Sequence, residues 1–144
     1  SRFCSIFTEH PPSTLVVAGA SFLAPVSADT ALCAAILAER TQQGWETLVA
    51  IQDDYVVATA SLLVERKFLH HGGRAGYLED VAVHPAHRRC GLGTAVVRAI
   101  CERAQERGCY KVVLHCRAEL VPFYRGAGFR GHAEGLRWDV PKSG

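Results

Sequence analysis

Residues 77–97 read YLEDVAVHPAHRRCGLGTAVV, and they carry the strongest indication of the fold. Its first part, Tyr77 to Val83, is rich in apolar residues as a strand is, and His84-Pro85 ends it. The glycine-containing loop 88–93 then precedes a helical pattern that stops at Gly108. The apolar residues that share one face of this pattern are Leu92, Val96, Val97, Ile100, Cys101 and Ala104. The stretch therefore predicts a strand, a glycine loop and an amphipathic helix.

The loop Arg88-Arg89-Cys90-Gly91-Leu92-Gly93-Thr94 is typical of an anion site at a helix start. The first N–H groups of a helix have no intrahelical partner, and the helix dipole favours negative charge beside them. Glycines let a ligand approach this backbone closely. A pyrophosphate fits the description. On these residues alone a plain glycine turn is an equal alternative, because the loop lacks the third glycine of a dinucleotide fold and the G-K-[ST] of a P-loop.

Working outward from this unit, the sequence predicts one α/β domain of the α+β kind, with a mixed central sheet flanked by helices on both faces. A strictly alternating, doubly wound fold does not match the order of the segments. We expect helices from Ser27 to Gly44, from 88–93 to Gly108 and over 121–125. The expected strands cover residues 21–23, 47–52, 55–65, 77–83, 109–116 and 136–140.

Composition excludes several classes of protein. The chain has 144 residues, which is the size of one domain, and a formal net charge of +2. This charge disfavours binding to nucleic acid or to a membrane surface, and no apolar stretch is long enough to span a bilayer. Six cysteines without a C-x-x-C pair indicate free thiols, so we expect neither a disulfide scaffold nor a metal site.

The expected organisation is an N-terminal extension over residues 1–18, whose placement the sequence leaves open, and a single domain over 19–144. Free thiols favour an intracellular, cytoplasmic protein. An organelle stays open as an alternative, because the chain has no methionine and Ser1 is therefore a processed or trimmed start.

Two motifs together resemble the GNAT superfamily of acetyl-CoA-dependent N-acetyltransferases. Its [QR]-x-x-G-x-[GA] pattern matches the glycine loop after the strand, and its F-Y-x-x-x-G-F pattern matches FYRGAGF at 123–129. The resemblance runs over about 120 residues and implies the mixed-sheet fold of that superfamily. It also implies direct transfer of an acetyl group from acetyl-CoA, as co-substrate, to an amine.

Three further stretches are similar to one branch of that superfamily, which acetylates the 2-amine of glucosamine 6-phosphate on the route to UDP-N-acetylglucosamine. They are ERKFLH at 65–70, GYLEDVAV at 76–83 and GCYKVVL at 108–114. The resemblance implies glucosamine 6-phosphate as the acceptor and a homodimer as the assembly.

The resemblance also implies a role for each matching residue. The loop residues Arg88, Arg89, Cys90, Gly91, Leu92, Gly93 and Thr94 would hold the pyrophosphate, and the backbone of Val81, Ala82 and Val83 would pair with the pantetheine arm. Glu79 and Asp80 would bind the amino sugar. Its hydroxyls and phosphate would contact Thr41, Lys67, His70, Tyr110 and Lys111, with some of these residues supplied by the second subunit.

Two residues are expected to take part in the chemistry. Tyr124 would donate a proton to the leaving thiolate, against the alternative that it only packs, and the carbonyl of His115 or a water chain would take the amine proton. His115 departs from the acidic residue usual in the family. Leu120 departs from an asparagine that contacts CoA, which puts that contact in doubt.

Other interpretations stay open. Glu79 and Asp80 are adjacent, so on a regular strand they point to opposite faces and do not form a two-carboxylate acid/base pair. The acceptor could be another primary amine, such as a polyamine or a protein N-terminus, although the basic residues Lys67, Arg74 and Lys111 disfavour a polyamine. A third alternative is a non-catalytic acyl-CoA-binding module.

Overall fold

The computed structural model describes residues 7–8, 30–53 and 55–144. These residues belong to two compact units, one that ends at Leu114 and one that runs from His115 to Gly144. The expected strand at 21–23 and the expected helix start at Ser27 lie outside the described residues.

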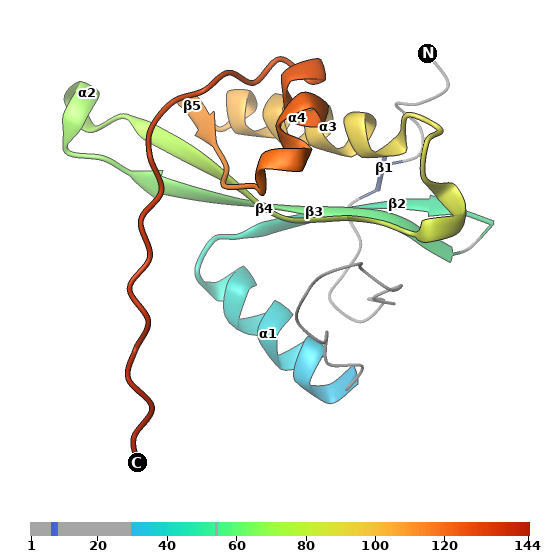
Figure 1. Ribbon diagram of the computed structural model, residues 1–144, viewed down its shortest axis with the longest axis horizontal. Coiled ribbons are helices and arrows are strands. Elements are labelled where there is room, and N and C mark those ends of the chain that lie inside the picture. The colour runs from blue at the N-terminus through green and yellow to red at the C-terminus, as the bar shows by residue number, and fades with distance from the viewer. Residues whose placement is uncertain (1–6, 9–29, 54) are drawn as a thin grey trace. The chain divides into compact units, whose positions relative to one another are not determined.

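The first unit contains a five-stranded mixed sheet in the order β1-β2-β3-β4-β5 (Figure 1). The first four strands are antiparallel neighbours, and β5 runs parallel to β4. The strands are β1 (Phe7–Thr8), β2 (Glu46–Gln52), β3 (Tyr55–Arg66), β4 (Arg74–Val83) and β5 (Cys109–Val113). The strands predicted over 47–52 and 55–65 are confirmed as β2 and β3, which form a hairpin that pairs from Gln52↔Tyr55 outward.

Two helices of the first unit, α1 (Thr30–Gln42) and α3 (Leu92–Glu106), lie on opposite faces of the sheet (Figure 1). The predicted mixed sheet with flanking helices is therefore confirmed. The predicted apolar stripe of α3 is almost wholly buried, with Cys101 half-buried beside it. Residues of this stripe and of the strands form the core, which consists of Leu48, Val49, Ala50, Val57, Ala58, Ala60, Leu62, Ala75, Leu78, Leu92, Val96, Val97, Ile100 and Ala104.

Gly76 is the point at which β4 packs most closely beneath α3. A Cβ atom at this position would lie 3.1 Å from Leu62 Cδ1 and 3.4 Å from Ala104 Cβ. The small residue therefore lets the helix lie directly against the sheet.

The second unit contains a 3₁₀ turn (Ala118–Leu120) and α4 (Val121–Gly126), as the predicted helix over 121–125 requires. The predicted last strand over 136–140 is wrong, because residues 129–144 contain neither helix nor strand. Leu136, Trp138 and Val140 do alternate with polar residues, yet their side chains are 98%, 78% and 78% exposed. Alternation favours a strand only where a neighbouring strand supplies hydrogen bonds, and no described strand pairs with these residues. The predicted strand over 109–116 is likewise shorter and ends at Val113.

A membrane span would need a long apolar helix, and none of the helices in the described ranges qualifies.

Candidate functional site

A β-bulge interrupts β4 at the predicted acidic pair. Glu79 pairs with Ser61 and Ala82 pairs with Thr59, so Asp80 and Val81 together lie opposite Ala60. Asp80 has a φ of 52°, in the left-handed region that residues other than glycine seldom adopt. The regular alternation behind the prediction that Glu79 and Asp80 point to opposite faces is therefore absent here. Glu79 is half-buried and Asp80 is exposed.

On the side of β5, the same half of β4 pairs with no strand among the described residues. The parallel register runs from Arg74↔Cys109 to Tyr77↔Val113, where β5 ends. Beyond Tyr77, no described strand continues along this edge of β4. Backbone groups of Val81, Ala82 and Val83 thus lie in a strand that has β3 as its described neighbour on one side, and an extended ligand could pair with the other side.

The glycine loop connects this strand to α3. A 3₁₀ turn (Pro85–His87) follows β4, and the loop then reaches Gly91, the N-cap of α3. Arg89 and Gly91 have φ values of 66° and 80°, so the chain passes through two left-handed residues before the helix begins. Gly91 has no side chain to satisfy the first N–H groups of α3, and a Cβ at this position would meet no atom within 4 Å. The predicted anion site is therefore open at a helix N-terminus.

Side chains of the loop fold back on its own backbone. Arg88 Nε donates to the carbonyl oxygen of Val83 at 3.3 Å, and Cys90 Sγ donates to that of His87 at 2.6 Å. The rings of His84 and His87 lie edge to face, and His84 Nδ1 accepts a hydrogen bond from Ala86 N–H. Two positive charges, those of Arg88 and Arg89, remain exposed beside the start of α3.

A second group of predicted residues lies at the tip of the β3–β4 hairpin. The tip is a single turn, α2 (Leu69–Gly72), in which His70 and His71 have left-handed backbone angles. The ring of His70 lies 4.3 Å from that of Tyr110, and Lys111 Nζ lies 5.6 Å from the centre of the Tyr110 ring. We call His70, Tyr110 and Lys111 the tip cluster. The structure thus brings three of the predicted phosphate and hydroxyl contacts together.

Lys67 lies beside the same tip, where its backbone N–H donates to the Gly73 carbonyl oxygen at 2.7 Å. Its Nζ donates to Glu65 Oε1 at 2.8 Å and to the Tyr77 hydroxyl at 2.9 Å. The hydrogen bond to Glu65, followed by that to Tyr77, raises the pKa of the Lys67 ammonium above its usual value, and hydrogen bonds with Lys67 and Tyr77 lower the pKa of the Glu65 carboxyl. Lys67 is therefore an ammonium ion paired with Glu65 beside the hairpin tip.

The remaining predicted contact, Thr41, lies in the last turn of α1, where its hydroxyl donates to the carbonyl oxygen of Leu37. The next residue to it, Arg40, forms an ion pair with Asp80 at 2.6 Å. Thr41 is therefore the sequence neighbour of a residue that contacts Asp80. Lys111 of the tip cluster pairs with Ala75 of β4, and Asp80 lies five positions further along that strand, which corresponds to about 17 Å between backbone positions.

Arg40 is not among the site residues predicted from the sequence. A cation in the last turn of a helix is common and gives no sign of a distant partner, so the pattern alone could not select it.

The two residues predicted to take part in the chemistry, Tyr124 and His115, belong to the second unit. Tyr124 is half-buried in α4, with ring centres of Phe123 and Phe129 at 4.9 and 6.0 Å. Burial, with a smaller contribution from the nearby Cys116, raises the pKa of the Tyr124 phenol. His115 and Leu120 are both exposed.

The sequence model of the acetyltransferase (GNAT) family matches residues 19–129. The chain is 41% identical over 85 residues to a glucosamine 6-phosphate N-acetyltransferase of Trypanosoma brucei brucei, and the match covers 59% of this chain and 58% of that protein. It is 50% identical over 80 residues to the probable glucosamine 6-phosphate N-acetyltransferase 2 of Oryza sativa subsp. japonica, covering 56% and 48%. The chain thus matches about half the length of these curated relatives.

Solved structures share the architecture. The crystal structure of glucosamine-6-phosphate N-acetyltransferase from Arabidopsis thaliana is similar with a TM-score of 0.75 at 28% identity, over 82% of this chain and 83% of that one. An acetyltransferase of Trypanosoma brucei is similar with a TM-score of 0.72 at 36% identity, over 81% and 82%.

Proposed function

Because this chain belongs to the GNAT acetyltransferase family, we propose that it transfers the acetyl group of acetyl-CoA to the 2-amine of glucosamine 6-phosphate. The products are N-acetylglucosamine 6-phosphate, on the route to UDP-N-acetylglucosamine, and CoA. The observation that carries this proposal is the bulge at Asp80, which lies on a strand edge that pairs with no described strand and is followed, after one 3₁₀ turn, by the glycine loop. In this proposal, one segment carries both the acid that binds the acceptor and the backbone that binds the cofactor, and the names of the curated relatives suggest the acceptor.

In this proposal the first unit binds acetyl-CoA through its backbone. Residues 88–94 hold the pyrophosphate, since the start of α3 offers N–H groups, an open glycine and two exposed arginines. The pantetheine arm pairs with Val81–Val83 along the free edge of β4, and an N–H of this segment donates to the thioester oxygen.

The acceptor lies between two groups of residues. Glu79 and Asp80 bind the amino sugar. Thr41, which follows the Arg40 that pairs with Asp80, contributes to the contacts with the hydroxyls and phosphate of the sugar. The phosphate is bound by cationic and hydrogen-bonding groups at the hairpin tip, namely Lys67 and the tip cluster.

These two groups belong to different copies of the chain. The backbone separation of about 17 Å along β4, from the residue that pairs with Lys111 to Asp80, is longer than a hexose phosphate, which favours a site in which one substrate molecule meets Asp80 of one chain and the tip cluster of another. A homodimer in which the hairpin tip of one chain reaches the bulge of its partner satisfies both sets of contacts. The dimer is therefore part of the proposed site, consistent with the exposure of Phe68 and Leu69 at the same tip.

The proposed chemistry is direct attack. The neutral amine forms its bond to the acetyl carbon, the bond from that carbon to sulfur breaks, and the amine proton leaves through the His115 carbonyl or a water chain. Tyr124 protonates the departing thiolate; its raised pKa keeps the phenol protonated at neutral pH. Alignment of the two bound reactants supplies most of the rate.

The test is release of CoA thiol from acetyl-CoA with a panel of amines: glucosamine 6-phosphate, glucosamine, spermidine and a peptide with a free N-terminus. Turnover confined to glucosamine 6-phosphate is the expected result. Turnover with spermidine or the peptide instead would replace the proposed acceptor. Binding of acetyl-CoA without turnover on any amine would identify an acyl-CoA-binding module and overturn the proposal.

A further inference from the structure

The last turn of α1 places a cation against the proposed acceptor-binding carboxylate. Arg40 Nη2 lies 2.6 Å from Asp80 Oδ2, and the two side chains are 29% and 57% exposed. Thirty-nine residues and two strands of the chain lie between them, so the contact depends on the way α1 is placed against β4.

The Arg40 side chain is itself supported by an aromatic ring. Its guanidinium carbon lies 4.4 Å from the centre of the Trp45 ring. The backbone fixes this arrangement, because Trp45 N–H donates to the Arg40 carbonyl oxygen at 2.9 Å and Gly44 N–H donates to that of Thr41 at 3.1 Å. With Gly44 at a φ of 80°, this is a Schellman cap, and the stacked pair occupies the positions at which such caps make their side-chain contact. An arginine stacked on an aromatic ring loses little freedom when it pairs with a carboxylate.

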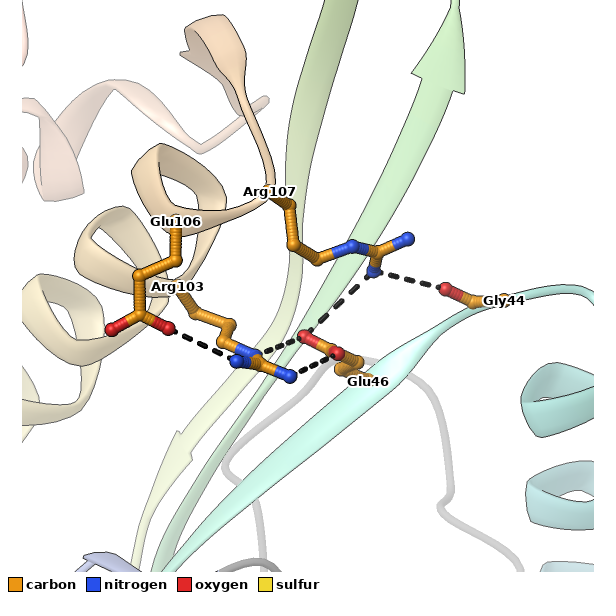
Figure 2. A network of polar contacts seen from close by, with 5 residues as sticks. All are labelled: Gly44, Glu46, Arg103, Glu106 and Arg107. Atoms are coloured by element: carbon orange, nitrogen blue, oxygen red, sulfur yellow. Dashed lines mark hydrogen bonds and ion pairs between the residues drawn. The ribbon is translucent and has the colours of Figure 1, made fainter.

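The cap is in turn tied to the sheet and to α3. Arg107 Nη1 donates to the Gly44 carbonyl oxygen at 3.2 Å, and Arg103 binds both carboxylate oxygens of Glu46, the residue after Trp45 (Figure 2). The turn that follows Arg40 is therefore held at two points, the Gly44 carbonyl group and the Glu46 side chain.

Asp80 requires such support, because its own strand does not provide it. The residue is in a bulge, has left-handed backbone angles and is exposed. A short carboxylate in that setting can adopt several side-chain rotamers. The ion pair uses Oδ2, and a carboxylate offers about four lone-pair positions on its two oxygens, so Asp80 can bind a ligand while it is paired.

We propose that Arg40 is a positioning residue for acceptor binding: seated on Trp45, it holds the Asp80 carboxylate in the orientation that accepts hydrogen bonds from the amino sugar. This inference rests on the proposed function, and it adds a residue that acts through Asp80 and not through the substrate. Exposed ion pairs contribute little to folding stability, so loss of this pair should leave the melting temperature nearly unchanged and the role of Arg40 can be measured separately on substrate binding.

The experiment is a double-mutant cycle on steady-state kinetics, with Arg40→Gln, Asp80→Asn and the double variant. We expect Arg40→Gln to raise KM for glucosamine 6-phosphate at least fivefold while KM for acetyl-CoA and the melting temperature change little. In the Asp80→Asn background the same change should have almost no further effect, because the carboxylate that it orients is gone. Arg40→Lys should restore part of the loss, since it keeps the charge and loses the planar fork.

Arg137→Gln is the matched control, because Arg137 forms an equally short ion pair with Asp139 in which the two side chains are 84% and 72% exposed. It should leave every kinetic constant unchanged. A loss from Arg40→Gln that is equally large in the unmodified chain and in the Asp80→Asn background would overturn the inference, as would no loss at all. Absence of turnover by the unmodified chain on glucosamine 6-phosphate would remove the proposed function and this inference with it, whereas turnover with independent losses removes the inference alone.

Discussion

Arg103 binds Glu46 through two hydrogen bonds, from Nε to Oε2 at 2.8 Å and from Nη2 to Oε1 at 2.9 Å (Figure 2). The same arginine also donates to Glu106, and Arg107 lies 3.7 Å from Glu46. This network joins the end of α3 to the start of β2. It fixes the junction from which the last turn of α1 reaches Asp80.

Loss of the contact between Arg103 and Glu46 should lower the free energy of unfolding measurably. We expect Glu46→Gln to lower the free energy of unfolding by about 1 kcal/mol, since two-point geometry places the pair at the upper end for partly exposed ion pairs. Urea unfolding measures it. In a cycle with Arg103→Gln the two losses should fall short of additivity, whereas Asp139→Asn, at an exposed pair, should have no measurable effect. Fully additive losses at positions 46 and 103 would show that the two side chains do not interact in solution.

Gly91→Val should abolish tight binding of acetyl-CoA. The added side chain would occupy the open space at the start of α3 through which the pyrophosphate approaches the N–H groups. Calorimetric titration with acetyl-CoA is the measurement. Gly44→Val is a matched control, because Gly44 has the same φ of 80° and equally open surroundings in a different loop, and it should bind acetyl-CoA as before. Unchanged affinity in folded Gly91→Val protein would refute the assignment of the loop.

Neutralising the tip cluster should affect one substrate more than another. Lys111→Gln and His70→Asn should each raise KM for glucosamine 6-phosphate about tenfold or more, and should change KM for unphosphorylated glucosamine little, because the phosphate alone carries the anion that they meet. The ratio of kcat/KM for the two sugars is the readout. Equal losses on both sugars would exclude a phosphate site at the hairpin tip.

Tyr124→Phe should lower kcat by at least about tenfold with acetyl-CoA affinity preserved, since it removes the hydroxyl and keeps the packed ring. Burial raises the pKa of this phenol above its usual value of about 10, so the phenol stays protonated between pH 7 and 9. The value of kcat should therefore show no loss from its ionisation in that range. A thioester with a more acidic thiol should recover part of the kcat of the variant. Near-normal kcat in Tyr124→Phe at saturating substrates would mean that the tyrosine only packs.

Elements whose signals are local could be predicted from the amino-acid sequence. The stripe of α3 is set by the 3.6-residue period, and almost every residue predicted to lie on it is buried. Gly91 and Gly108 flank the helix because both adopt a positive φ. The glycine loop and the acidic pair could also be located in the sequence, because their residue types and spacing can be recognised without knowing which elements pack against them.

Features that depend on a partner far away in the chain could be seen only in the tertiary structure. Leu136, Trp138 and Val140 have the alternation of a strand and form none, because a strand exists only through hydrogen bonds to another strand. The bulge at Asp80 arises from a register shift against β3, which one strand's sequence does not encode. Likewise, Arg40 meets Asp80 only because a capped helix and a network at the end of α3 place it there, since contacts between residues so far apart in the chain depend on how whole elements pack.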